Sequence, residues 1–177
     1  MQYTSKYHSP LGDILLAADG VGLTGLWFKG QKYFGLYLDE EHEEKELPVF
    51  DQAKKWLDVY FSGKEPKTKV PIHMTGTPFQ NEVWKILYEI PYGKTMTYGE
   101  IAKKMAEKRG TKAMSAQAVG GAVARNEISI IVPCHRVVGA TGSLTGYAGG
   151  INKKIALLKL EGAYKDTFFV PKHSTAP

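Results

Sequence analysis

The chain is poor in cysteine and has no long apolar run, and each shortage argues against a class of protein. With Cys134 as the one cysteine among 177 residues, the chain can form no internal disulfide and no zinc site that needs two or more cysteines. Its five histidines lack metal-ligand spacing, so we expect neither a metal nor a cofactor. The first apolar stretch, Leu15 to Ala17, is closed by Asp19, which argues against a signal peptide or a membrane span. We expect a cytoplasmic protein, or a nuclear one if the source is eukaryotic.

Charges of the two signs lie in different parts of the sequence. The net charge of +5 permits a polyanionic partner. Residues 39–46 are strongly acidic, whereas basic residues gather from Lys103 onward. This segregation predicts that the carboxy-terminal half faces phosphates, although charge alone fits two ordinary solvated faces equally well. The basic residues are Lys103, Lys104, Lys108, Arg109, Lys112, Arg125, Arg136, Lys153 and Lys154.

The amino-terminal part of the sequence has the pattern of a small sheet followed by one helix. Runs at 3–8, 13–18 and 22–28 are separated by hairpin-type turn signals and predict three strands. Apolar residues at helical spacing over 50–61 predict an amphipathic helix. The segment 64–72 contains prolines and should be extended, either as one more strand or as a linker between two units.

From Thr77 onward the pattern becomes helical. Thr77 is an N-cap followed by Pro78 at the first helical position, and the two predict a helix that ends before Pro91. Thr97 and Glu100 form a capping box, in which the hydroxyl and the carboxylate satisfy first-turn amides reciprocally. The helix that this box opens should extend to about residue 108.

A further short helix is predicted from Ser115, its N-cap, to about Ala124, after a basic turn. Two helices joined in this way are typical of a helix-turn-helix, although helical hairpins are more often plain packing units. Gly120 and Gly121 lie inside the second helix, where each glycine costs about 1 kcal/mol relative to alanine. We therefore expect a close backbone approach there, either by a neighbouring element or by a ligand.

Cys134 lies in the motif Pro133-Cys134-His135-Arg136, after the β-branched run 128–132, which predicts a buried strand. A lone cysteine is usually a small buried hydrophobe. At a strand end it can instead be a nucleophile, because His135 or Arg136 could lower the pKa of the thiol or supply a base. Neighbours on an extended chain point in opposite directions, so contact between Cys134 and His135 requires a turn. The residues alone leave both interpretations open.

Residues 77–162 resemble the catalytic domain of the O6-alkylguanine-DNA alkyltransferases, also called methylated-DNA–protein-cysteine methyltransferases. The Pro-Cys-His-Arg-Val core at 133–137 is highly specific to that family, and the other matching blocks occur in the family's order and spacing. The amino-terminal domain fits the family's variable domain only in pattern. The matching blocks are 79–90, 90–93, 97–102, 118–122, Asn126, 131–139, 146–150 and 157–162.

The resemblance implies an α/β (α+β) fold with two domains. A small amino-terminal α/β domain with a β-hairpin sheet would span 1–74, and a mainly helical catalytic, DNA-binding domain with the helix-turn-helix would span 75–165. A tail at 166–177 would follow, disordered after Phe169. The implied function is DNA repair by direct reversal. A methyl or other alkyl group would pass irreversibly, in one turnover, from O6-alkylguanine to the protein's own cysteine, with O4-alkylthymine as a second candidate substrate.

The implied partner is double-stranded DNA that carries alkylated bases, and we expect a monomer without membrane association. The family pattern gives catalytic roles to five residues. Cys134 would be the acceptor thiol, His135 would act through a water as its base, and Glu161 would orient His135. Asn126 would brace the turn after the recognition helix, and Tyr98 would hydrogen-bond the guanine as it leaves. Apart from the resemblance, Glu161 could be a helix-end carboxylate, Asn126 a helix-stop residue and Tyr98 a structural side chain.

The same pattern implies a pocket and a DNA-binding helix. The target atom lies inside a duplex, so the nucleotide would be flipped out at a cost of a few kcal/mol. The recognition helix at 115–124 would enter the minor groove, where small residues allow a close approach. Tyr147, which also fits a core aromatic, would hold the base together with Val137, Ala148 and Val123. The DNA-contacting residues would be Ser115, Gln117, Ala118, Gly121, Arg125 and Arg136.

Two positions depart from the family pattern. Gln117 stands where the family has an arginine finger, so it keeps a flat polar end but lacks the charge. We predict weaker duplex binding or slower repair than in a Gln117→Arg variant, and equal rates would contradict this. Glu127 follows Asn126, where many members have proline, and we derive no consequence from the sequence.

Three other functions compete with alkyl transfer. A DNA-binding sensor that reports alkylation of Cys134 would be expected to carry an added domain or metal-binding cysteines, and the sequence shows neither. A thiol hydrolase built on Cys134, His135 and Glu161 would turn over many times and would need no basic groove. A relative that binds lesions without repairing them is disfavoured because the cysteine is intact.

Overall fold

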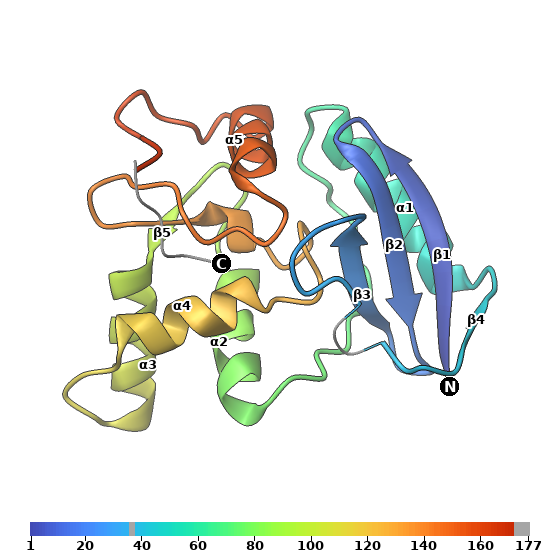
Figure 1. Ribbon diagram of the computed structural model, residues 1–177, viewed down its shortest axis with the longest axis horizontal. Coiled ribbons are helices and arrows are strands. Elements are labelled where there is room, and N and C mark those ends of the chain that lie inside the picture. The colour runs from blue at the N-terminus through green and yellow to red at the C-terminus, as the bar shows by residue number, and fades with distance from the viewer. Residues whose placement is uncertain (36–37, 172–177) are drawn as a thin grey trace. The chain divides into compact units, whose positions relative to one another are not determined.

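The computed structural model describes residues 1–35 and 38–171, and the chain forms two compact units (Figure 1). Unit 1 contains Met1–Thr75 together with Glu127–Ser129. Unit 2 contains Gly76–Asn126 and the chain from Ile130 onward. Three residues from the middle of the carboxy-terminal half therefore belong to unit 1. Residues 172–177, on which most of the expected tail disorder falls, lie outside the described residues.

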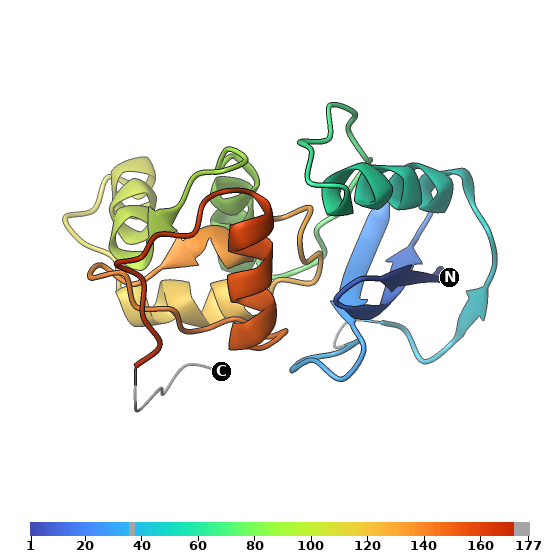
Figure 2. The same ribbon diagram turned by 90° about the horizontal axis from the view of Figure 1, so that it is seen from above.

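Unit 1 is a sheet with one helix against it. Strands β1 (Gln2–Ser9), β2 (Gly12–Ala18) and β3 (Leu23–Phe28) pair antiparallel in sequence order. Strand β4 (His42–Glu44) pairs parallel to β1, which gives the order β3-β2-β1-β4. Helix α1 (Pro48–Phe61) lies across one face of the sheet (Figures 1 and 2). The three predicted strands and the predicted helix are confirmed, whereas β4, inside the acidic segment, was not predicted.

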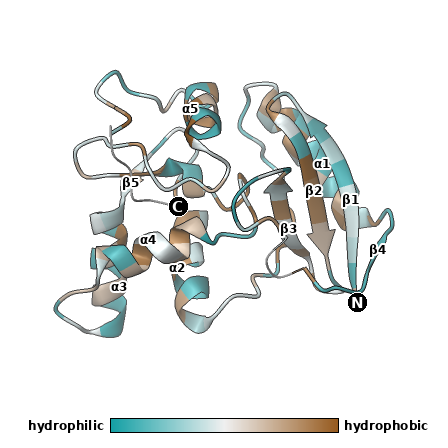
Figure 3. Ribbon diagram, viewed as in Figure 1, coloured by the Kyte–Doolittle hydropathy of each residue, from teal (hydrophilic) through white to brown (hydrophobic). Residues whose placement is uncertain are grey.

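The helix lies on the sheet because both carry an apolar surface. Helix α1 buries Phe50, Ala53, Leu57 and Tyr60, which recur at helical spacing on one side. Strands β2 and β3 consist mainly of hydrophobic residues, in contrast to β1 (Figure 3). All six residues of β3 are buried. Burial on this scale is the main source of stability for such a unit.

Strand β3 is an edge strand of the sheet, and two segments from elsewhere in the chain cover it. Leu23 forms a parallel bridge with Ile72, and Leu26 forms another with Ile128. The amide of Leu26 donates to the carbonyl oxygen of Glu127 at 2.8 Å. Such cover satisfies edge groups that would otherwise be open to pairing with another chain. The extended segment predicted at 64–72 thus meets the sheet at its end.

The strand predicted at 128–132 is wrong. Ile128 makes the single bridge to β3, and residues 129–131 form turns. Ile130 is buried and has a φ of 70°, in the left-handed region that β-branched residues rarely enter. Backbone of this kind costs on the order of 1–3 kcal/mol and persists only where the surroundings enforce it. The β-branched run therefore supplies buried side chains to a strained loop, and this loop leads to Cys134.

Unit 2 is mainly helical. Helices α2 (Pro78–Tyr88) and α3 (Tyr98–Arg109) both pack against α4 (Ala116–Ala124). Strands β5 (Met96–Thr97) and β6 (Val137–Val138) form a short parallel pair, and α5 (Ile151–Leu160) follows. The indole of Trp84 in α2 donates to the carbonyl oxygen of Ala122 in α4 at 2.8 Å. This arrangement confirms the predicted helix-turn-helix.

The helix starts predicted in unit 2 are confirmed, because each has its own cap. Thr77 and Thr97 both form capping boxes, with Gln80 and Glu100 as their partners. The Ser115 hydroxyl accepts from the amide of Ala118 at 3.2 Å.

No helix in the described part of the chain is both long and apolar enough to cross a bilayer.

The predicted tail begins too early. Phe168 is 8% exposed and belongs to a hydrophobic cluster with Val138, Leu144, Leu158 and Ala163. The carbonyl oxygen of Phe169 also accepts from the amide of Leu144 at 2.8 Å. Residues up to Phe169 are therefore part of unit 2.

Candidate active site

Cys134 lies at the start of a short turn. Residues Cys134–Arg136 form one turn of 3₁₀ helix, in which the amide of Arg136 donates to the carbonyl oxygen of Pro133 at 3.0 Å. The amide of Cys134 donates to the carbonyl oxygen of Val132 at 2.8 Å. The turn that the Cys134–His135 pair requires is therefore present. The cysteine is 6% exposed, so a substrate has to reach an almost covered sulfur.

The groups around the Cys134 thiol shift its pKa in opposite directions. Burial raises the pKa of the Cys134 thiol, whereas a hydrogen bond from the Asn126 side chain, the charge of Lys154 and the backbone of Cys134 and His135 act to lower it. The Asn126 amide also donates to the carbonyl oxygen of Val132 at 2.7 Å. Asn126 thus closes the loop before Cys134 and hydrogen-bonds its thiol.

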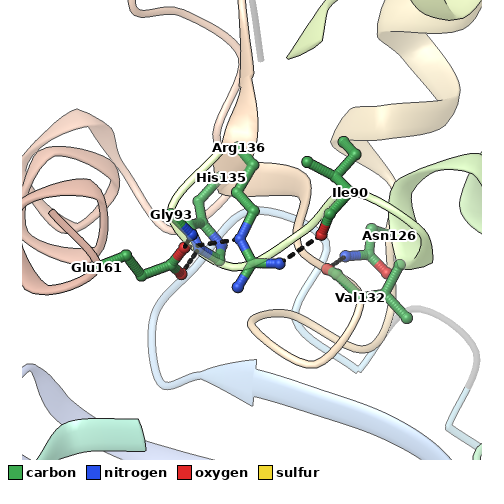
Figure 4. Close-up of polar contacts among 7 residues, drawn as sticks. All are labelled: Ile90, Gly93, Asn126, Val132, His135, Arg136 and Glu161. Atoms are coloured by element: carbon green, nitrogen blue, oxygen red, sulfur yellow. Dashed lines mark hydrogen bonds and ion pairs between the residues drawn. The ribbon is translucent and has the colours of Figure 1, made fainter. Parts of the chain in front are cut away.

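Glu161 connects three parts of unit 2 (Figure 4). Its Oε2 lies 2.5 Å from Nε2 of His135, and its Oε1 accepts from Nε of Arg136 at 2.7 Å and from the amide of Gly93 at 3.1 Å. The side chain is fully buried at the end of α5. Burial alone would raise the pKa of Glu161, but His135 and Arg136 hold it well below its usual range.

Burial and the contact with Glu161 set the protonation of the His135 ring. Its burial lowers the pKa of the imidazole despite the opposing effect of Glu161, so the neutral ring is favoured. A carboxylate only accepts hydrogen bonds, and Nε2 therefore carries the hydrogen that faces Glu161. Nδ1 then bears the lone pair that can take a proton. Within residues 1–35 and 38–171, no three His, Cys, Asp or Glu side chains are grouped to hold a metal ion.

Arg136 was predicted to contact DNA, but the structure places its side chain inside unit 2. The residue is 7% exposed. Its Nη1 donates to the carbonyl oxygen of Ile90 at 2.7 Å, and its guanidinium lies 5.6 Å from the ring centre of Tyr92. Together with the contact to Glu161, these bonds make Arg136 an internal counter-charge. Charge patterning places arginines on the surface and gives no signal for this role.

Tyr98 lies at the first position of α3 and hydrogen-bonds a loop carbonyl. Its hydroxyl donates to the carbonyl oxygen of Thr145 at 3.0 Å. Burial and, to a smaller extent, the charge of Cys134 raise the pKa of Tyr98 to about 12. The phenol thus keeps its proton at neutral pH and can donate a hydrogen bond.

Lys154 belongs to the site, although its charge predicted that it would face phosphates on the surface. It is fully buried, and its Nζ donates to the carbonyl oxygens of Val137 at 2.5 Å and Thr145 at 2.7 Å. Burial lowers the pKa of Lys154 to about 8, against the charge of Cys134. A signal was present, because Lys154 lies three residues before Leu157, on the apolar side of α5.

Three of the four residues expected to hold the base are buried. Tyr147 is 4% exposed, and its ring meets His135 edge-on, with 6.4 Å between the ring centres. Val123 and Val137 are buried, and Ala148 is half-buried. The structure thus brings Tyr147 to His135. A base pocket formed by these four residues remains a prediction.

The exposed side of α4 is small and uncharged. Ser115, Gln117 and Ala118 are exposed, whereas Gly121 and Arg125 are half-buried. A methyl group at Gly121 would lie 3.4 Å from Nη1 of Arg125, and one at Gly120 would lie 3.9 Å from the Tyr98 ring. Both are ordinary van der Waals distances, so a methyl group would fit at either position. The expected close approach to these two glycines, by a neighbouring element or by a ligand, stays a prediction.

Together the fold and the site define a helix-turn-helix protein with a buried cysteine that directly precedes a hydrogen-bonded His–Glu pair. Residues 78–163 match the model of the 6-O-methylguanine DNA methyltransferase DNA-binding domain. Residues 2–74 match the ribonuclease-like domain of the same proteins. The chain belongs to the 6-O-methylguanine DNA methyltransferase family.

Relatives cover nearly the whole chain. A methylated-DNA–protein-cysteine methyltransferase of Methanosarcina acetivorans is 47% identical over 162 residues, which are 91% of this chain and 99% of that protein. A methyltransferase of the same name from Mycobacterium leprae is 44% identical, over 91% of this chain and 93% of its own. The crystal structure of Mycobacterium tuberculosis OGT in complex with DNA has a TM-score of 0.78 and 42% identity, over 91% of this chain and 93% of that one. These matches confirm the resemblance and the fold class.

Proposed function

We propose that this protein repairs DNA by direct reversal, as a monomer that transfers an alkyl group irreversibly from O6-alkylguanine to the sulfur of Cys134. The observation that carries this proposal is the 2.5 Å contact between His135 and Glu161, because His135 directly follows Cys134 in the sequence. Family membership and a relative solved with DNA support it. O4-alkylthymine is the second candidate substrate. Because the substrate is cellular DNA, we place the protein in the cytoplasm, or in the nucleus if its source is eukaryotic.

The proposed transfer moves one proton and one alkyl group. His135 accepts the thiol proton, through a water, and the Glu161 carboxylate stabilises the imidazolium that forms. The thiolate attacks the alkyl carbon in line. The S–C bond forms, the C–O6 bond breaks, and the electron pair remains on the purine. Tyr98 donates its proton to the leaving guanine, and the proton from Cys134 restores the phenol.

The product explains why one protein repairs one lesion. Cys134 becomes a thioether, which is a poor leaving group, and no residue is proposed to hydrolyse it. The guanine takes the proton that Tyr98 donates, and the proton from the thiol replaces it, so the overall step balances. A hydrolase with the same Cys134, His135 and Glu161 would need a thioester or another labile intermediate. Transfer of an alkyl group provides none.

DNA is proposed to meet the exposed side of α4. Its small residues allow close approach to the floor of the minor groove, and the lesion is flipped toward Tyr147. Val123, Val137 and Ala148 are proposed to complete the base pocket. Ser115, Ala118, Gly121 and Arg125 remain proposed DNA contacts, and Arg136 is removed from that set because it is buried.

Gln117 is proposed to fill the stack that the flipped base vacates. It is exposed on α4 and uncharged, so the Gln117→Arg variant should bind the lesion duplex more tightly or react faster. A gain of roughly tenfold corresponds to about 1.4 kcal/mol and is the scale we expect for one added charged contact. Single-turnover rates at several duplex concentrations separate binding from transfer.

Intact mass measurement tests the proposed function. The protein is mixed with a duplex that carries one O6-methylguanine, and both protein mass and released methyl groups are followed. We expect one added methyl on Cys134, one repaired guanine per protein, and no reaction in Cys134→Ser. A duplex with O4-methylthymine tests the second substrate. Repeated release of methanol would contradict the proposal and favour a hydrolase.

A further inference from the structure

A buried carboxyl group that the transfer mechanism does not use lies at the start of the loop that carries Cys134. Glu127 is 2% exposed. Its Oε2 accepts a hydrogen bond from the Thr75 hydroxyl at 3.1 Å. Its Oε1 has no hydrogen-bond partner among the residues that the structure describes. A carboxyl group buried in this way requires an explanation, because burial without partners is unfavourable.

The ionisable groups nearest in the chain are engaged elsewhere. Strand β3, on which Glu127 lies, has no ionisable side chain. His73, which precedes Thr75, is 2.6 Å from Asp19. Arg125 donates to the carbonyl oxygen of Gly121 at 3.1 Å. Burial raises the pKa of Glu127 to about 7, against the weaker effect of the Thr75 hydroxyl, and the neutral acid is the form that suits this site.

Glu127 connects two structural features that bear on the nucleophile. It directly follows Asn126, whose side chain hydrogen-bonds the Cys134 thiol. It also begins the segment 127–129, which pairs with β3 through Leu26. The burial of one side chain therefore anchors the backbone from which Asn126 projects. If the segment leaves β3, Asn126 loses this anchor.

We propose that Glu127 is a positioning residue for the transfer and acts as a buried carboxylic acid, which holds the segment 127–129 on β3 and, through Asn126, holds Cys134 in its reactive arrangement. This inference rests on the proposed alkyl transfer. Ionisation of Glu127 favours release of the side chain to solvent. The release frees the start of the Cys134 loop.

The direction of the pH effect follows from the two states of the segment. In the released state, Glu127 ionises near the ordinary pKa of about 4.3, whereas on β3 it keeps its proton up to about pH 7. Pairing of segment 127–129 with β3 is therefore most favoured below pH ~4.3. It weakens as the pH rises to about 7, and above that pH it no longer changes. Within this window the ratio of paired to released segment falls by up to about tenfold per pH unit.

Hydrogen exchange and transfer rates test the proposal together. Glu127→Gln keeps the shape of the side chain without its charge, and Glu41→Gln at an exposed position is the matched control. We compare protection factors of the Leu26 and Ser129 amides, and single-turnover transfer from an O6-methylguanine duplex, from pH 5 to 8. The ratio of Glu127→Gln to parent should rise several-fold between pH 5 and 7 in both measurements and then level off. Glu41→Gln should follow the parent throughout.

The two measurements distinguish failure of the Glu127 proposal from failure of the proposed alkyl transfer. Protection ratios that do not change with pH overturn the proposal, as do transfer ratios that stay flat while protection changes. If Glu127→Gln does not fold, a fall in the parent's own Leu26 and Ser129 protection factors from pH 5 to 7 supports the proposal, and constant factors overturn it. If neither protein accepts a methyl group, the proposed function fails. The protection factors of the Cys134 and His135 amides then decide whether Glu127 orders the loop.

Discussion

Two glutamates are buried around the Cys134 loop, and burial has opposite results for them. Glu161 meets the guanidinium of Arg136, the ring of His135 and the amide of Gly93. Glu127 meets one hydroxyl. The pKa of Glu161 is accordingly far below its usual range, and that of Glu127 is raised to about 7. Partners, more than depth, therefore decide which of the two carboxyl groups is charged.

The largest expected effect is that of Glu161→Gln. The variant leaves Arg136 as a buried cation without its counter-charge, which should lower the free energy of unfolding by about 3–5 kcal/mol. The imidazolium of His135 also loses its stabilising charge, and transfer should slow by roughly 10³–10⁴-fold. Denaturant unfolding and single-turnover rates measure both. The same substitution at Glu127 is the matched test, and equal destabilisation by the two would show that their different partners do not matter.

Arg136→Met should destabilise the protein by about 3 kcal/mol, because it leaves the Glu161 carboxylate buried without its cation. It should leave the salt dependence of duplex binding unchanged, since Arg136 is internal. Lys112→Met, in the exposed turn before α4, is the control and should reduce the slope of log K against log salt by about 0.9 if it contacts one phosphate. A reduced slope in Arg136→Met would instead return this residue to the DNA surface.

The two glutamates should also shape stability against pH with opposite signs. The lowered pKa values of Glu161 and His135 give stability at neutral pH that is lost on acidification, in the case of Glu161 below pH ~4.3. The raised pKa of Glu127 acts in the other direction, and its contribution is lost as the pH rises from ~4.3 to about 7. Glu127→Gln should therefore gain about 1–3 kcal/mol over the parent at pH 7.5 and nothing at pH 4. Unfolding curves across this range test it, and a gain independent of pH would contradict it.

Thr75→Val should have the smallest effect. The hydrogen bond from the Thr75 hydroxyl lowers the pKa of Glu127, so its removal should raise that pKa further. The neutral acid then persists to higher pH, while the loss of one hydrogen bond costs about 1 kcal/mol. Carboxyl-carbon titration by nuclear magnetic resonance follows the shift. An unchanged titration would show that Thr75 and Glu127 do not interact.

Local signals in the sequence predicted the helix starts. Thr77, Thr97 and Ser115 each cap a helix through groups no more than three residues away, and such contacts form from the sequence nearby. The hairpin strands and α1 were predicted for the same reason. The site was placed mainly by the family pattern, because no local signal brings Glu161 to His135 across 26 positions.

The predictions that were wrong concern residues whose neighbours in space come from distant parts of the chain. Arg136 and Lys154 are charged side chains that a sequence places on the surface, yet each finds buried acceptors on distant segments. The run 128–132 has the composition of a strand, but Ile130 adopts a left-handed conformation and only Ile128 reaches the sheet. Glu127 had no assignment at all, because its role depends on Thr75 and on β3.

The cover on β3 has a consequence for biosynthesis. The ribosome makes β3 early, but the segment that covers Leu26 is made only after the 54 residues from Gly76 to Ser129. At 5–20 residues per second, translation of that stretch takes roughly 3–11 s. During this interval the edge of β3 at Leu26 is open to pairing with other nascent chains. Slow translation between residues 76 and 129 should therefore increase the aggregation of newly made protein.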